Sequence, residues 1–189
     1  MFSKPSIQVS SLSKPVLENL WKDPERYKQT YFGRWPNIYT GDYAVRDPDG
    51  YFWLLGRADE VLKVAGHRIG TVELESAFVS HPAVSEAAVI GKEDAVKGEV
   101  PVTFVTLRSG FSPSEELRQQ LAQHIRATIG PIATPDAIAI VNKLLKTRSG
   151  KIMRRLLKAV LAGAALGDVS TLEDKASVED IKATYDELR

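Results

Sequence analysis

Five basic residues and no acidic one occupy positions 146–155, where the sequence reads KTRSGKIMRR. Such a stretch could bind nucleic acid, hold a phosphate, lie on a membrane, or carry one lysine with a chemical role. It is not a P-loop, because Leu145 stands where GxxxxGK[ST] requires its first glycine and Ile152 where it requires serine or threonine. A basic nucleic-acid helix would be expected to have interleaved aromatic residues, which are absent here. A solvated basic face remains the simplest alternative.

A second stretch with chemical potential is YTGD, residues 39–42. Asp42 follows a glycine turn directly, and a carboxylate in that position can accept two hydrogen bonds from a ribose diol. The common alternative is a turn that leads into a hairpin.

The third stretch is GRADEVLKVAGHRIGTVELE, residues 56–75. Its glycines, Gly66 among them, permit close backbone approach or a positive φ. Arg57 could pair with a carboxylate or a ribose oxygen, and Arg68 with a phosphate. A glycine-bearing hairpin with solvated charges explains the same residues equally well.

The composition restricts the function classes. The chain has 189 residues, 43% of them hydrophobic, and a formal net charge of +1, which suits a globular protein without a global field toward nucleic acid or anionic lipid. Without cysteine there are no disulfides or Cys-type zinc sites, and His67, His81 and His124 lack a metal-ligand spacing. No secretory signal and no apolar run of about 18 residues is present. We expect a soluble cytoplasmic protein with no metal site, no nucleic-acid partner and no membrane partner.

Charge is uneven along the chain. Residues 143–158 contain seven basic and no acidic residues, whereas residues 168–189 contain seven acidic and three basic ones. The acidic end is therefore predicted to dock near the basic stretch or to shield it.

The first third of the chain has two predicted elements. A short helix should follow Asp23-Pro24 within residues 21–31. Residues 39–57 read as a β-hairpin with a strong turn at 47–50. The YFWLL segment at 51–55 is predicted to be a buried strand.

After residue 58 the predicted order is helix, strand, strand, helix, strand, helix, which is an α+β domain whose short sheet is covered by helices. The first helix has Thr71 as its cap candidate. Two strands at 83–91 and 100–107 flank a charged loop, and a helix capped by Ser112 and Glu115 follows. The apolar face of that helix is predicted to consist of Leu117, Leu121 and Ile125. A strand at 137–141 and a final helix at 151–163 complete the predicted domain.

In this order and spacing the three stretches resemble those of the AMP-forming adenylate family, which includes acyl-CoA synthetases, peptide-synthetase adenylation domains and luciferases. Further segments, such as WKDPERYKQTYFGRWP and IGPIATPDAIAIV, are similar to the acetate–CoA ligase branch. The resemblance covers nearly the whole chain from about Leu20. It implies the C-terminal portion of a ligase that converts acetate, ATP and CoA into acetyl-CoA, AMP and pyrophosphate. A propionyl or other acyl-CoA ligase fragment, or a non-catalytic nucleotide- or CoA-binding module, are the alternatives.

The resemblance also implies a domain organisation. Residues 1–58 would be the tail of a large N-terminal domain, 59–167 the AMP-binding C-terminal domain, and 168–189 an acidic extension. The phosphate loop, the acyl pocket and most Mg²⁺ contacts would lie in the N-terminal domain, so the chain alone is expected to be inactive.

Roles carry over only where residues match the family's motifs. Lys151 matches the catalytic lysine of adenylation and would be the site of reversible acetylation by an acetyltransferase and deacetylase. By the same resemblance, contacts to ATP or AMP would come from Asp42, Arg57 and Arg68. Contacts to CoA would come from Ala65, Gly66 and Arg126. The hinge between the two domains would be Asp59.

Overall fold

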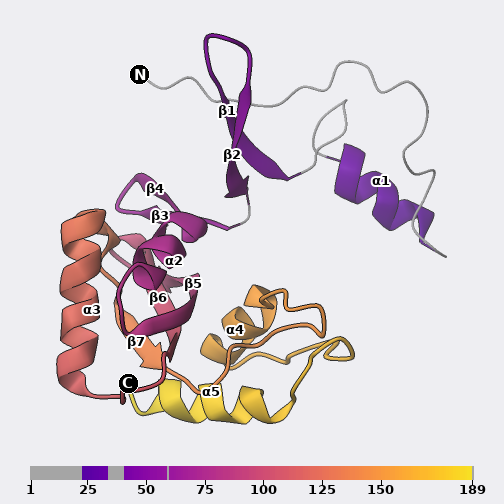
Figure 1. Cartoon of the computed structure of the whole chain (residues 1–189). Helices are drawn as coiled ribbons and strands as arrows, with labels where there is room; N and C mark the ends of the chain where they lie inside the picture. The colour runs from indigo at the N-terminus through magenta and orange to yellow at the C-terminus, as the bar shows by residue number, and fades with distance from the viewer. Residues whose placement is uncertain (1–22, 34–40, 59, 189) are drawn as a thin grey trace. The chain divides into compact units, whose positions relative to one another are not determined.

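The computed structural model describes residues 23–33, 41–58 and 60–188, in two compact units, residues 1–59 and 60–189 (Figure 1). In the first unit, helix α1 (Pro24–Phe32) begins where Asp23 Oδ1 accepts a hydrogen bond from the Arg26 N–H at 3.0 Å. A side-chain cap followed by proline at the first helical position is a strong start signal. The helix predicted after Asp23-Pro24 is confirmed.

The predicted hairpin is also confirmed, as strands β1 (Asp42–Arg46) and β2 (Phe52–Arg57). Asp47 closes the turn by accepting from the Tyr51 N–H at 2.9 Å and the Trp53 indole N–H at 3.0 Å. The hydrogen bond from Trp53 is the main cause that lowers the pKa of the Asp47 carboxyl.

The prediction that the 51–55 strand is buried is wrong for its first three residues. Tyr51, Phe52 and Trp53 are 72%, 54% and 63% exposed. A two-stranded ribbon has no second layer of its own to exclude water from its faces. The aromatic residues of this segment therefore indicated that it forms a strand, but they did not indicate that the strand is buried.

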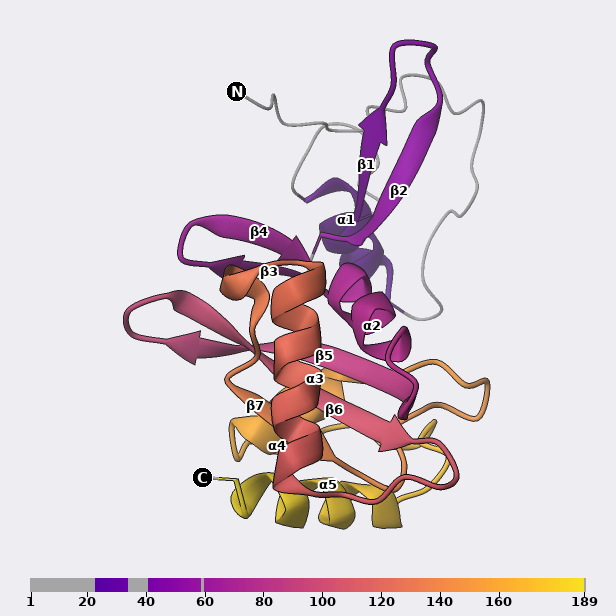
Figure 2. The same cartoon turned by 60° about the vertical axis from the view of Figure 1, so that its left-hand side comes forward.

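The second unit contains a five-stranded sheet in the order β4-β3-β6-β5, with β7 parallel to β6 (Figure 2). Its elements are β3 (Val61–Val64), β4 (His67–Gly70), α2 (Thr71–Val79), β5 (Val84–Asp94), β6 (Gly98–Leu107), α3 (Glu115–Thr128), η1 (Pro131–Ala133), β7 (Ala137–Ile140), α4 (Arg154–Leu161) and α5 (Ala176–Asp186).

Both faces of this sheet are covered. Side chains alternate along a strand, so Ala87 and Val89 of β5 pack with α2 and α3, while Ala88 and Ile90 pack with α4 and α5. Burial on both sides explains why β5 and β6 read as nearly continuous apolar runs. The predicted α+β architecture of a sheet covered by helices is confirmed.

The charged loop predicted between the strands at 83–91 and 100–107 is mostly strand. β5 and β6 continue in register to the Asp94↔Gly98 pair, which leaves only residues 95–97 as the turn. Asp94 Oδ1 accepts from the N–H groups of Lys97 at 2.7 Å and Val96 at 2.9 Å, and these bonds lower the pKa of the Asp94 carboxyl. Backbone pairing thus extends past the apolar core, where charged side chains reach solvent.

Two predicted caps were misplaced. Thr71 is the first residue of α2, not its cap; Gly70 holds the cap position without a side-chain bond. Helix α3 begins at Glu115 because Ser114 Oγ accepts from the Leu117 N–H at 3.1 Å, two residues after the predicted Ser112. The predicted apolar face is confirmed, since all three of its residues are buried: Leu117, Leu121 and Ile125.

Helix α5 was not predicted, and α4 is therefore not the final helix. α5 buries Val178, Ile181 and Tyr185, and the Tyr185 ring lies 6.4 Å from that of Phe104. The acidic residues between these apolar positions obscured their helical spacing. Within the described ranges, no helix is long and apolar enough to cross a membrane.

A histidine pair joins the end of α2 to α3. The rings of His81 and His124 lie 5.3 Å apart, and His124 Nε2 lies 3.0 Å from the Ala77 carbonyl oxygen. His81 Nδ1 accepts from the Ala83 N–H at 3.2 Å, so this nitrogen is unprotonated. Burial, and then the nearby His124, lower the pKa of His81.

The observed cap of α3 predicts that Ser114→Ala lowers the free energy of unfolding by about 1 kcal/mol, because the Leu117 N–H loses its acceptor. Ser112→Ala is the matched control and should stay within about 0.5 kcal/mol of the unaltered chain. Urea unfolding followed by circular dichroism measures both. A larger loss for Ser112→Ala would restore the original cap assignment.

The lowered pKa of His81 predicts that the folded chain binds fewer protons than the unfolded chain near pH 6.5. Stability should therefore be present above that pH and fall as the pH drops from about 7.5 toward 5.5. His81→Asn retains an acceptor for the Ala83 N–H and should flatten this dependence in urea titrations. An unaltered slope in His81→Asn would contradict the assignment.

Candidate functional site

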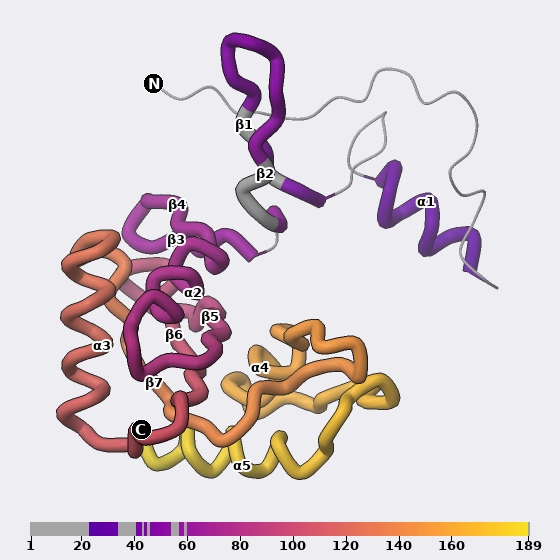
Figure 3. Tube along the Cα trace, in the orientation of Figure 1, coloured from indigo at the N-terminus to yellow at the C-terminus, as the bar shows by residue number. Residues whose placement is uncertain are grey.

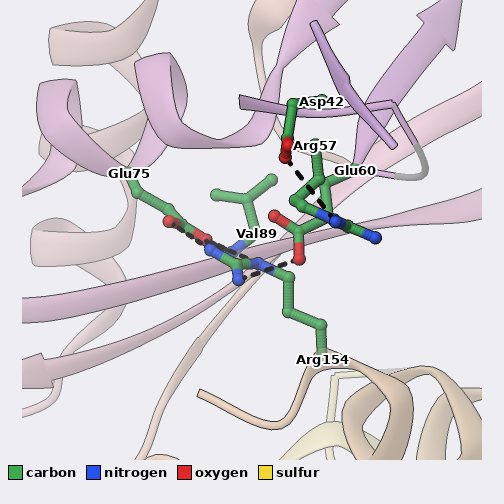
Figure 4. Close-up of polar contacts among 6 residues, drawn as sticks. All are labelled: Asp42, Arg57, Glu60, Glu75, Val89 and Arg154. Carbon is green, nitrogen blue, oxygen red and sulfur yellow. Dashed lines mark hydrogen bonds and ion pairs between the residues drawn. The ribbon is translucent and has the colours of Figure 1, made fainter. Parts of the chain in front are cut away.

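Asp42 and Arg57 face each other at the open end of the β1–β2 hairpin. They are cross-strand partners, and Arg57 Nη1 lies 3.6 Å from Asp42 Oδ1 (Figure 4). Gly41 has a φ of +80°, and a Cβ there would meet Arg57 Nη2 at 3.0 Å. The glycine turn thus makes room for the guanidinium beside the carboxylate. Both side chains are substantially exposed, so their pairing can rearrange around a ligand at little cost.

Lys151 lies on a tight loop before α4. The loop is closed by the Lys146↔Ile152 bridge and by the Thr147 N–H, which donates to the Lys151 carbonyl at 2.9 Å. Gly150, with a φ of +81°, turns the chain, and Thr147 Oγ1 accepts from the Lys151 N–H at 3.1 Å. The Lys151 side chain is exposed, and no ion pair or hydrogen bond of its ammonium group occurs within the described part of the chain. Backbone hydrogen bonds therefore fix the loop, while the ammonium group of Lys151 has no ionic partner among the described residues.

The acidic end of the chain docks along this loop, as the charge pattern predicted. Figure 3 follows the two segments side by side. Thr147 bridges to Leu172, the Glu173 N–H donates to the Lys146 carbonyl at 2.9 Å, and Lys143 Nζ lies 3.6 Å from Asp174 Oδ2. Most of these contacts are backbone hydrogen bonds, so strand-like pairing and not charge alone joins the segments.

Ala65 and Gly66 form the two-residue turn of the β3–β4 hairpin. Both have positive φ, 47° and 83°, which is the geometry of a type I′ turn between the paired Val64 and His67. The Ala65 N–H donates to the Lys97 carbonyl at 2.8 Å. A Cβ on Gly66 would meet no atom within 4 Å. The turn is thus fixed in shape and open on its outer side.

Two arginines accompany this turn. Arg68 stands opposite Lys63 in the β3–β4 register, and both side chains are exposed. Like charges directly opposite each other destabilise a strand pair, so a bound anion would relieve the repulsion. Arg126 lies exposed in the last turn of α3, whose C-terminal end is beside the hairpin in both cartoon views.

The predicted site residues of the second unit therefore fall into two groups. The 146–152 loop lies beyond α4, on the side of the unit away from the β3–β4 turn (Figures 1 and 2). Ala65, Gly66, Arg68 and Arg126 gather at the other end. The predicted hinge, Asp59, lies outside the described residues. No group of three metal-ligating side chains occurs in the ranges that the structure describes.

A partly buried ion-pair network links α4 to α2 and to the residue before β3, and it was not predicted. Arg154 Nη2 lies 2.7 Å from Glu75 Oε2 and 2.9 Å from Oε1, and Nη1 lies 3.2 Å from Glu60 Oε1 (Figure 4). These side chains are only 17%, 13% and 23% exposed. Glu75 Oε1 also accepts from the Val89 N–H of β5 at 2.9 Å.

The chemistry of the network is set by burial. Desolvation raises the pKa of Glu75, while the Val89 N–H and Arg154 act in the opposite direction. Arg154 thus stabilises a carboxylate that burial disfavours, and does not project toward solvent as its basic neighbourhood suggested. Glu75 adjoins the apolar residues of its helix, including Leu74. This position beside the apolar face was the sequence signal that Glu75 could point inward.

Known proteins resemble this chain in sequence and in fold. Residues 73–151 match the family described as the AMP-binding enzyme C-terminal domain. The chain is 65% identical over 175 residues to an acetyl-coenzyme A synthetase of Pyrobaculum arsenaticum, covering 92% of this chain and 26% of that protein. It is 52% identical over 176 residues to a 3-hydroxypropionyl-coenzyme A synthetase of Metallosphaera sedula, with coverage of 92% and 26%.

Solved structures show the same relationship. The anthranilate CoA ligase AuaEII in complex with anthranoyl-AMP has 40% identity and a TM-score of 0.62, over 75% of this chain and 27% of that one. An acyl-CoA synthetase of Brucella canis has 41% identity and a TM-score of 0.54, over 72% and 26%. The chain spans about a quarter of the length of the curated relatives it matches. It is similar to these CoA synthetases and ligases over most of its own length, and its residues 73–151 match the AMP-binding enzyme C-terminal domain.

Proposed function

We propose that the chain is the C-terminal portion of an AMP-forming acetate–CoA ligase. The observation that carries the proposal is the placement of the Lys151 loop and the Ala65–Gly66 turn on different sides of one unit. A ligase with two half-reactions needs one face for adenylation and another for thioester formation, and rotation of a small domain can present them in turn. Asp59 is proposed as the residue about which the unit rotates.

In the adenylation step, Lys151 is proposed to stabilise negative charge that develops at the α-phosphate of ATP. Its ammonium group has no ionic partner in the described chain, and backbone hydrogen bonds close the loop that carries it, so the charge is available to pair with a phosphate. Asp42 is proposed to bind the ribose hydroxyls, with Arg57 beside it, and Arg68 to contact a phosphate. The Mg²⁺ that accompanies ATP is proposed to be held by a preceding N-terminal domain, together with the acyl pocket.

In the thioester step, the open turn at Ala65 and Gly66 is proposed to face the pantetheine arm of CoA. Gly66 leaves space on its outer side, which a long thin group could occupy. Arg126 at the end of α3 is proposed to contact a CoA phosphate.

Acetate is the proposed acid because identity to an acetyl-coenzyme A synthetase reaches 65%, against 52% for a 3-hydroxypropionyl-coenzyme A synthetase. Ligation of 3-hydroxypropionate is the alternative, because the acyl pocket that selects the acid is expected to lie outside this chain. The cytoplasm is the proposed location. Acetylation of Lys151 by an acetyltransferase, reversed by a deacetylase, is proposed as regulation because it would remove the charge.

The proposal is tested in a chimera that joins this chain to the N-terminal part of the P. arsenaticum relative. Lys151→Ala should lower acetate-dependent ATP–pyrophosphate exchange by about 10²–10³-fold, the scale of one lost transition-state donor. Release of acetyl-CoA from supplied acetyl-adenylate should persist. Lys158→Ala, an exposed lysine on α4, is the control and should affect neither step. Equal loss of both steps in Lys151→Ala would contradict the assignment.

Gly66→Leu should show the opposite pattern in the same chimera. Thioester formation should be blocked, while pyrophosphate exchange stays largely intact, because a side chain would enter the proposed pantetheine path. Gly66→Asn separates strain from obstruction, since asparagine accepts a positive φ more readily than leucine. Full thioester activity in Gly66→Leu would exclude the turn from the CoA site.

A further inference from the structure

Arg154 connects the Lys151 loop to the framework of the second unit. It is the first residue of α4 and follows Lys151 by three positions. Its guanidinium bonds both oxygens of Glu75 on α2 and one oxygen of Glu60, directly before β3. Glu75 is itself bound to the Val89 N–H of β5. One side chain thereby ties the C-terminal stem of the loop to a helix and two strands.

The other contacts act within the loop, with residues 171–173, or on its N-terminal stem, where Lys146 Nζ forms an ion pair with Glu86 of β5. The Thr147–Lys151 hydrogen bonds and the Lys146↔Ile152 bridge act within the loop. The Met153 N–H donates to the Leu145 carbonyl at 2.8 Å, which joins the two stems to each other. The fork of Arg154 is a polar anchor from the loop's C-terminal stem to α2 and to the start of β3.

The β3–β4 turn is held by different contacts. Its strands pair from Val61↔Gly70 to Val64↔His67, and the Lys63 N–H donates to Glu99 Oε2 at 2.7 Å. The Ala65 N–H is bound to the Lys97 carbonyl. None of these bonds includes Arg154, so its loss should displace the Lys151 loop and leave the turn in place.

We propose that Arg154 is a positioning residue for Lys151, acting through its fork to Glu75 and Glu60. The inference rests on the proposed function of Lys151 in adenylation and adds to it a device that holds the ammonium group at the α-phosphate. Arginine suits this role because its planar fork meets two carboxylates at once, whereas a lysine presents a single point charge. Displacing a reacting group by about 1 Å can lower a rate by about 10²-fold.

The experiment uses the same chimera with Arg154→Met and Arg154→Lys. Arg155→Met is the matched control, because this neighbour on α4 donates to the carbonyls of Leu166 and Asp168 and takes no part in the network. Arg154→Met should lower kcat for pyrophosphate exchange by about 10–100-fold, with KM for ATP within about twofold. Thioester formation from acetyl-adenylate should stay within about twofold. Arg154→Lys should recover part of the exchange rate, and Arg155→Met should retain both rates.

Several outcomes would overturn the inference: equal loss of both half-reactions in Arg154→Met, an unchanged exchange rate, or an equal defect in Arg155→Met. If Arg154→Met does not fold, Glu75→Gln provides the same test, because its amide oxygen can still accept from Val89 while the ion pair is lost. Lys151→Ala in parallel separates the two proposals. A normal exchange rate in Lys151→Ala refutes the proposed function, whereas a defect there with normal Arg154→Met refutes only the positioning role.

Discussion

The partly buried contact between Arg154, Glu75 and Glu60 is the constraint on which the arrangement of the second unit depends. Burying these charges is unfavourable unless each is paired, and their exposed fractions of 13–23% leave little water to compensate for a lost partner. The raised pKa of Glu75 shows that desolvation outweighs its favourable contacts. We infer that this network contributes less to the free energy of unfolding than to the position of α4, because Arg154 must meet both carboxylates at once.

The apolar core also fixes the position of α4 relative to the sheet. Strands β5 and β6 pack one face against α2 and α3 and the other face against α4 and α5. The sheet therefore separates two groups of helices. A shift of α4 would disturb packing on one face, while the turn at Ala65 and Gly66 belongs to the other end of the sheet. The fold can thus hold two sites rigidly without making the shape of one depend on the shape of the other.

Much of this architecture follows from sequence, and the exceptions have physical causes. Strong local signals, such as Asp23-Pro24 and the apolar spacing of Leu117, Leu121 and Ile125, gave the correct elements. Tyr51, Phe52 and Trp53 misled because β-propensity does not specify what covers a strand. Thr71 and Ser112 were plausible caps, but hydrogen-bond geometry selects one residue among several with suitable side chains.

The site was accessible to sequence reasoning only in part. Short motifs led to the predictions of Lys151, Gly66 and the Asp42–Arg57 pair, because their neighbours along the chain define their local geometry. The positioning role that we propose for Arg154 was not accessible in this way. Its partner Glu75 is 79 positions away, and a basic residue in a basic stretch gives no sign that it points inward.

The pairing of the 146–152 loop with residues 171–173 affects how the protein is made. Synthesis proceeds from the N-terminus at about 5–20 residues per second, so the loop leaves the ribosome one to several seconds, as a rough figure, before the segment that completes its hydrogen bonds. Until then the Thr147 and Lys146 backbone groups on that side are exposed to water or to other chains. The loop is among the last parts of the unit to complete its contacts, and a nascent chain interrupted before Leu172 would carry Lys151 without the segment that pairs with its loop.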